Sequence, residues 1–234
     1  RARQAGVTAF VCAAGNVQDS RAALAIARRE ANVYCLAGVH PHDAKDAGAD
    51  DLAELERLLG EPKTVALGEA GLDYHYNFSP PEDQRRVFAE QLALARRLGR
   101  HVVVHTREAF GDTLAILRDS GLAGADVLFH SCTEPPENVR AILDFGATVS
   151  YSGIVTFANA ADVRAGAALV PPDRLLIETD APYLSPEPVR KMKTNEPANV
   201  AHVATFLASE RKTSPEALAE QTTANAVCFF GLPL

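Results

Sequence analysis

Short apolar runs rich in β-branched residues alternate with helical segments along the chain, and this alternation constrains the fold more than any other feature. The runs recur at seven places, beginning near Val7, Val33, Thr64, His101, Asp126, Ala147 and Arg174. Most of the segments between them carry the periodicity of amphipathic helices. Repeated strand-helix units place parallel strands in one sheet, with helices packed against it. The sequence therefore predicts seven such units.

Proline and glycine mark the ends of several expected helices. Pro81 stands early in one helix, Gly99 follows its last residue, and Ser214 and Pro215 open the final helix. Proline suits the first turn of a helix, and glycine suits the position just beyond its end. We expect helices over residues 20–30, 51–59, 82–98, 110–118, 136–143, 200–209 and 215–229.

Two architectures with parallel strands compete for this pattern. A closed (β/α)8 barrel needs eight strands, and residues 1–6 have the character of the last turn of a helix that ends at Gly6. An open doubly wound sheet usually carries a glycine-rich phosphate loop after its first strand, and residues 13–16 are poor in glycine. We expect an α/β protein of the TIM-like (β/α)8 barrel class with its first strand absent. Residues 1–234 are then a single, N-terminally incomplete domain.

Composition agrees with an ordinary folded protein. The 234 residues are 47% hydrophobic and 23% charged, which suits one domain with a substantial core. No apolar run approaches the roughly 18 residues that span a bilayer, so no membrane segment is expected. The four cysteines lie far apart without a Cys-x-x-Cys pair, which favours a reduced, cytoplasmic protein over a disulfide framework or a zinc ribbon.

The formal net charge of −7 disfavours broad, nonspecific adhesion to nucleic acid, because such binding needs many cationic side chains. A nuclease is still compatible with this charge. Acidic residues that hold divalent cations create a local positive site, and a phosphodiester can bind there.

Four side chains with metal-binding chemistry follow predicted strands. Glu69, His105, His130 and Asp180 each stand where an apolar run ends. This end of the strands carries the active site in α/β barrels, so we expect the four side chains to converge. Two imidazoles and two carboxylates suit Zn²⁺, Mn²⁺ or a similar ion, which lowers the pKa of bound water and favours hydrolysis. Either histidine alone would be an ordinary hydrogen-bonded residue at the barrel rim.

Other side chains near these strands are candidates for holding the substrate. His40 follows a predicted strand and is assigned to substrate binding, with metal ligation or capping of the loop by hydrogen bonds as alternatives. His42 is expected to be the structural member of the two. Arg107 lies two residues beyond His105, and its planar guanidinium suits a phosphate. Arg190 is a further phosphate candidate, in a loop whose charges alternatively pair among themselves.

Two carboxylates are assigned supporting roles. Glu178 lies two residues before Asp180, so on a continuing strand both point to the same side, with Glu178 one layer deeper. A contact with a ligand or a structural role suits Glu178 better than ligation, and Asp73 is expected to be structural.

Six ordered motifs resemble the TatD deoxyribonuclease family of metal-dependent, amidohydrolase-like barrels. They are GVHPH at 38–42, GEAGLDY at 68–74, VHTR at 104–107, FHS at 129–131, ETDAPYL at 178–184 and NEP at 195–197. The resemblance extends from about Gly6 to Leu232. Several motifs in one order at consistent spacing are specific to this family.

The resemblance implies a site for two divalent ions such as Mg²⁺, Mn²⁺ or Zn²⁺. Glu69 would bridge both ions, His105 and His130 would complete one, and Asp180 would bind the other and help to activate water. His40 would lie close to the substrate phosphate. The implied reaction is hydrolysis of DNA phosphodiester bonds from a 3′ end by metal-activated water, with no obligatory protein partner. A small amide or ester substrate is the alternative.

The start of the chain departs from the family pattern. Family members begin with a strand that carries His-x-His, and no such pair precedes Gly6. The spacing recurs in His40-Pro41-His42, but these residues belong to a later motif. We therefore expect at most one tightly held metal ion in these residues. The alternative is a catalytically impaired barrel with a binding or scaffold role.

Overall fold

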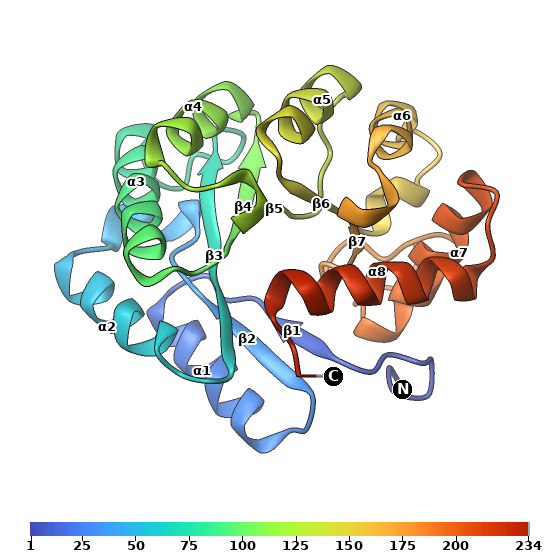
Figure 1. Cartoon of the computed structure of the whole chain (residues 1–234), viewed down its shortest axis with the longest axis horizontal. Helices are drawn as coiled ribbons and strands as arrows, with labels where there is room; N and C mark the ends of the chain where they lie inside the picture. The colour runs from blue at the N-terminus through green and yellow to red at the C-terminus, as the bar shows by residue number, and fades with distance from the viewer. Residues whose placement is uncertain (234) are drawn as a thin grey trace. The chain divides into compact units, whose positions relative to one another are not determined.

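The computed structural model describes residues 1–233, in which seven β-strands alternate with helices (Figure 1). The strands follow one another in the sheet in chain order, from β1 to β7. A doubly wound sheet would reverse this order at a switch point, whereas an α/β barrel does not. The chain therefore has seven strands of the α/β-barrel class, as predicted. The strands are β1 Phe10–Cys12, β2 Val33–Ala37, β3 Thr64–Asp73, β4 Val102–Arg107, β5 Val127–Phe129, β6 Thr148–Tyr151 and β7 Leu175–Ile177.

The expected helices are all present, with ends that differ from the predicted ones by at most three residues. They are α1 Val17–Arg29, α2 Ala49–Leu59, α3 Pro81–Leu98, α4 Phe110–Ser120, α5 Pro136–Phe145, α7 Val200–Glu210 and α8 Pro215–Phe230. Gly99 ends α3 with a left-handed φ of 61°, and the Ser214 side chain caps α8 by accepting the Ala217 amide. None of the described helices has the length and apolar character needed to cross a membrane.

One helix, α6 (Ala161–Leu169), was not predicted from the sequence. It is built largely from alanine and glycine, so it lacks the large apolar residues whose spacing reveals an amphipathic helix. Its Gly166 packs against α5, and a Cβ at this glycine would come within 2.9 Å of Val139 Cγ2. Small residues therefore hold α6 in place through close approach, a signal that periodicity does not record.

The described residues form two compact units, residues 9–128 and residues 129–233 together with 1–8. In the first unit, β1 to β4 pair in parallel, and α1 to α4 pack against them (Figure 1). The helices bury their apolar faces on the strands, and the side chains of Leu67, Val104 and Leu92 are fully buried. This core holds the ends of β2, β3 and β4 in a fixed arrangement.

The beginning of the chain has the predicted helical ending. The Gly6 amide donates to the Arg3 carbonyl and the Val7 amide to the Ala2 carbonyl, at 3.2 and 3.1 Å. This pair of hydrogen bonds around a residue of positive φ is the Schellman arrangement that ends helices. Strand β1 begins at Phe10, whereas the sequence had indicated a start near Val7.

Two strands continue beyond the points at which the apolar runs predicted them to end. Residues 64–73 form one strand and 102–107 another, so Glu69 and His105 lie within strands and not at their ends. Pairing between β3 and β4 continues through Gly71 with His105 to Asp73 with Arg107. Backbone hydrogen bonding extends these strands into polar sequence, which hydropathy does not detect.

Truncating a core residue of this unit tests its packing. We expect Leu92→Ala to lower the free energy of unfolding by about 2–5 kcal/mol, because the side chain is fully buried and its loss leaves a cavity. Ile26→Ala, at a position 42% exposed on α1, is the control and should change it by less than about 0.5 kcal/mol. Urea denaturation measures both, and equal effects would contradict the described burial.

Candidate metal centre

A β-bulge aims the Glu69 side chain. Between Leu67 and Ala70, β3 has one more residue than the facing segment of β4, where Val102 and Val104 are the partners. Such a bulge interrupts the pleat and redirects a side chain. Gly68 makes it possible, since it adopts a φ of 149° and a Cβ there would lie 2.8 Å from the Val103 carbonyl oxygen.

Glycine also permits the close pairing of β3 with β4 at His105. A Cβ on Gly71 would fall on the His105 carbonyl group, and the residue has a φ of 152°. Any other residue would push the two strands apart. The glycines of the motif GEAGLDY therefore position a carboxylate and an imidazole on adjacent strands.

Three of these side chains gather into a cluster with metal-binding chemistry. His40 follows β2, Glu69 lies in the bulge of β3 and His105 lies in β4, and one ligand atom from each is within 4.8 Å of the others. All three are half-buried. An imidazole nitrogen of His105 and a carboxylate oxygen of Glu69 are donors that suit Zn²⁺, Mn²⁺ and related ions, and a nitrogen of His40 lies beside them. The residues therefore fit a divalent metal.

A backbone hydrogen bond determines which nitrogen of His40 carries the proton. The His42 amide donates to His40 Nδ1 at 3.2 Å. An amide can only donate, so Nδ1 is the acceptor and the proton of the neutral ring is on Nε2. In this tautomer His40 presents an N–H, which suits a phosphate oxygen better than a metal ion. The hydrogen bond thus favours substrate binding over ligation for His40.

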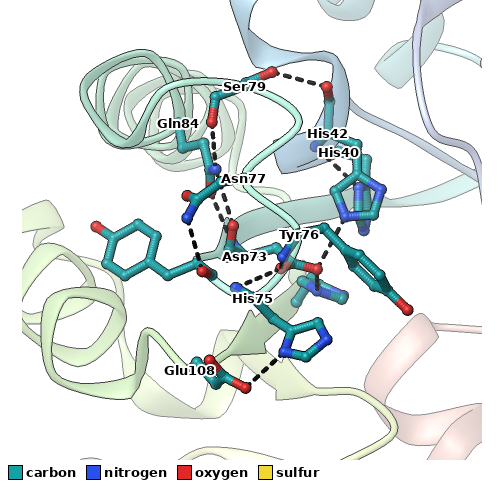
Figure 2. Close-up of polar contacts among 11 residues, drawn as sticks. His40, His42, Asp73, His75, Tyr76, Asn77, Ser79, Gln84 and Glu108 are labelled. Atoms are coloured by element: carbon teal, nitrogen blue, oxygen red, sulfur yellow. Dashed lines mark hydrogen bonds and ion pairs between the residues drawn. The ribbon is translucent and has the colours of Figure 1, made fainter.

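The Asp73 carboxylate connects the cluster to its surroundings. Its Oδ2 accepts hydrogen bonds from Nε2 of His42 and Nε2 of His105, at 2.9 and 3.4 Å, and its Oδ1 accepts the amides of His75 and Tyr76 (Figure 2). Burial raises the pKa of Asp73, but the hydrogen bonds from His105, Tyr76 and His42 outweigh it and hold the pKa well below its usual value. The charged carboxylate orients both imidazoles, as carboxylates commonly do beside metal-binding histidines.

Arg107 lies two residues beyond His105 in β4 and on the same side of that strand. Its side chain is exposed, and its Cζ lies 4.6 Å from the centre of the Tyr76 ring. The aromatic contact holds the guanidinium in place while its hydrogen-bond donors stay at the surface. This arrangement suits the predicted contact with a phosphate.

In the second unit, His130 follows β5 and pairs with a carboxylate. Its Nδ1 lies 3.2 Å from Glu178 Oε1, and Ser150 Oγ donates to Glu178 Oε2 at 2.6 Å. Burial raises the pKa of Glu178, but the nearby His130 and the hydrogen bonds from Ser150 and the Ser131 amide bring it below its usual value. With Nδ1 donating to this carboxylate, Nε2 of the neutral ring carries the lone pair that a metal ion requires.

Asp180 lies three residues beyond β7, in a turn that is fixed by hydrogen bonds. It is half-buried and has a φ of 53°. The Asn195 side-chain amide donates to the carbonyls of Thr179 and Tyr183, both at 2.7 Å, and so fixes the backbone on each side of the aspartate. The motif NEP at 195–197 therefore supports the turn that carries Asp180.

Arg190 makes structural contacts in this unit. Its Cζ lies 3.8 Å from the centre of the Phe157 ring, and its Nη1 is 3.9 Å from Glu187 Oε1. The sequence had left pairing of this loop with Glu187 open for Lys191 and Lys193, and the structure places Arg190 near that carboxylate. A phosphate contact by Arg190 stays a prediction.

The predicted site residues thus fall into two groups. Glu69 and His105 lie together with His40 in one unit, whereas His130 and Asp180 belong to the other. Convergence of all four ligands stays a prediction. Sequence reasoning underestimated Asp73, whose only signal was its position in the motif GEAGLDY.

Comparison with known proteins identifies the family. The model of the TatD related DNase family matches residues 1–231. The 3′-5′ ssDNA/RNA exonuclease TatD of Erwinia amylovora is 38% identical over 238 residues, covering 99% of this chain and 92% of that protein. The uncharacterized metal-dependent hydrolase YcfH of Escherichia coli K12 is 44% identical over 199 residues, 85% of this chain and 74% of that protein.

Solved structures agree with these matches. The structure of YJJV, a TatD homologue from Escherichia coli K12, has a TM-score of 0.93 and 26% identity, covering 99% of this chain and 90% of that one. A TatD family hydrolase from Entamoeba histolytica has a TM-score of 0.88 at 22% identity, covering 98% and 86%, and shares the fold. The chain belongs to the TatD related DNase family.

The role of Asp73 can be tested through metal binding. We expect Asp73→Asn to weaken divalent-ion affinity by about 10- to 100-fold, because an amide orients the His105 imidazole less firmly than a carboxylate does. Isothermal titration with Mn²⁺ measures the affinity, and circular dichroism checks the fold. Asp50→Asn, at an exposed position in α2, is the control. Unchanged affinity in a folded Asp73→Asn protein would refute the proposed orienting role.

Proposed function

We propose that this chain is a metal-dependent nuclease that hydrolyses phosphodiester bonds of single-stranded nucleic acid from the 3′ end. The observation that carries the proposal is the cluster of His40, Glu69 and His105, whose donor atoms lie within 4.8 Å of one another. Family membership supports it, as does a relative named 3′-5′ ssDNA/RNA exonuclease that matches over nearly the whole chain.

Glu69 and His105 would hold a divalent ion in the first unit, with Asp73 fixing the orientation of the imidazole. When bound, such an ion supplies Lewis acidity toward a phosphoryl oxygen and lowers the pKa of water. In the second unit, we propose His130 and Asp180 as metal ligands and Asp180 as the acceptor of a proton released by water.

His40 and Arg107 would bind and orient the phosphate. His40 has its proton on Nε2, and this N–H can donate to a non-bridging oxygen. Arg107 presents an exposed guanidinium, whose paired donors match phosphate geometry. A hydrogen bond to a charged group typically contributes about 1.5–3 kcal/mol. Two local donors of this kind allow phosphate binding on a chain whose net charge is −7.

The relatives do not favour the alternatives, namely hydrolysis of a small amide or ester and a barrel without catalysis. The curated relatives are named as metal-dependent hydrolases or as a nuclease. An amidohydrolase from Saccharomyces cerevisiae is similar in structure, but at 18% identity it shows only a shared fold.

Two histidine variants separate phosphate binding from metal binding. We expect His105→Ala to lose both bound metal and turnover. His40→Ala should keep the metal and lose about 10- to 100-fold in kcat/KM, the equivalent of one hydrogen bond to a charged group. Metal content is measured by mass spectrometry and turnover with 3′-end-labelled single-stranded DNA.

The control for these two variants is His101→Ala, a substitution of a half-buried histidine that lies immediately before β4. It should leave both measurements unchanged. Parallel loss of metal and turnover in His40→Ala would make His40 a ligand. Absence of turnover in the metal-loaded parent protein would overturn the proposed function.

A further inference from the structure

Two exposed aromatic rings stand on the loop that follows β3. The rings of Tyr76 and Phe78 are stacked, with their centres 5.3 Å apart and their planes inclined by 16°. Tyr76 is 47% and Phe78 57% exposed, and within residues 9–128 Ile26 is the only other large apolar side chain exposed to this degree. We call Tyr76 and Phe78 the aromatic pair.

The aromatic pair lies next to the candidate metal centre. The His42 ring meets Tyr76 and Phe78 edge to face, at 5.5 and 4.8 Å between ring centres. The same ring lies 4.3 Å from that of His40, a member of the cluster. Figure 2 shows the Tyr76 ring on the same side of the loop as His40 and His42. A single imidazole therefore separates the pair from the position proposed for the phosphate.

Hydrogen bonds hold this loop in one conformation. The Tyr76 amide donates to Asp73 Oδ1, and Asn77 Nδ2 donates to the Tyr74 carbonyl, at 2.9 and 2.8 Å (Figure 2). Ser79 Oγ donates to the carbonyl of His42, which ties the loop to the segment after β2. The loop is fixed before any ligand arrives, so a ligand that stacks on the rings meets a small entropic cost.

Gln84 fixes the loop from α3. Its Nε2 donates to the carbonyls of Asp73 and Ser79, at 3.0 and 2.8 Å, while its Oε1 accepts the Asp73 amide at 2.7 Å. The side chain is fully buried. Both ends of the loop are therefore anchored to the core of the unit.

Positive charge lies beside the aromatic pair. The exposed guanidinium of Arg107 lies over the Tyr76 ring at 4.6 Å. Proteins that bind single strands without sequence preference combine cationic groups, which contact the backbone, with aromatic rings on which bases stack. The internal bases of a duplex are already stacked on one another, so they offer no free face to such rings. Exposed aromatic rings beside a cationic side chain are therefore suited to binding an unpaired base.

We propose that Tyr76 and Phe78 form a stacking platform for one nucleobase of a single-stranded nucleic acid, next to the phosphate bound by His40. The inference rests on the proposed function, because it names how the same site would select its substrate. Stacking uses the face that every base shares, so the platform selects single strands over duplexes and tolerates any sequence.

Binding of labelled oligothymidylate with the metal chelated tests the platform without requiring hydrolysis. Fluorescence anisotropy is measured for an intact strand and for one with abasic sites at its 3′ end. We expect Phe78→Ala to weaken binding of the intact strand by about 5- to 100-fold, the effect of losing one stacked base. The abasic strand should bind the parent and the variant equally.

Three further variants serve as controls. Phe78→Trp should retain affinity because it keeps an aromatic face, and Phe78→Leu should weaken binding as Phe78→Ala does, which covers the case that alanine disturbs the fold. Ile26→Ala removes another exposed apolar side chain, on α1, and should change nothing.

The proposal is overturned if Phe78→Ala weakens both strands equally, if the parent protein does not distinguish them, or if the parent binds neither. Hydrolysis is measured separately on the metal-loaded parent protein. Base-dependent binding without hydrolysis would remove the proposed function and keep the platform. If Phe78→Ala and abasic sites both leave the rate of hydrolysis unchanged, the proposed function stands and the platform is removed.

Discussion

The charged Asp73 carboxylate is the interaction on which the rest of the site depends. It is almost fully buried, and a buried charge is tolerated only when hydrogen bonds replace its water. Two imidazoles and two loop amides provide them. The same carboxylate therefore sets the orientation of His105 in the cluster and the path of the loop that carries Tyr76. The hydrogen bonds to this one buried carboxylate therefore link the candidate metal centre to the exposed loop beside it.

Pairing of a carboxylate with an imidazole recurs in the second unit, where Glu178 contacts His130. In both units the carboxylate orients an imidazole. A histidine whose ring orientation and tautomer are set in advance needs no reorganisation to bind an ion. In the first unit, the backbone also positions the side chains of Glu69 and His105. The bulge at Glu69 and the glycine opposite His105 bring two adjacent strands to the spacing that the cluster requires.

Strand-helix alternation was sufficient to predict the order of elements, because burial on parallel strands leaves a strong apolar signal. The grouping of Glu69 with His105 followed from their positions after apolar runs. Helix α6 was missed because alanine and glycine carry little periodicity. The extension of β3 to Asp73 was missed because Gly68, Glu69 and Gly71 interrupt its apolar run. Long-range hydrogen bonds such as that between Asp73 and His42 have no local signature. The sequence analysis did not single out Tyr76 and Phe78, because only the structure shows that these rings are exposed.

The most direct test of this account is an anomalous-difference map from crystals soaked in Mn²⁺. We expect a peak at a position coordinated by a carboxylate oxygen of Glu69 and an imidazole nitrogen of His105, with Asp73 outside the coordination sphere and hydrogen-bonded to His105. A peak bound by Asp73 itself, or an ion held away from both Glu69 and His105, would contradict it.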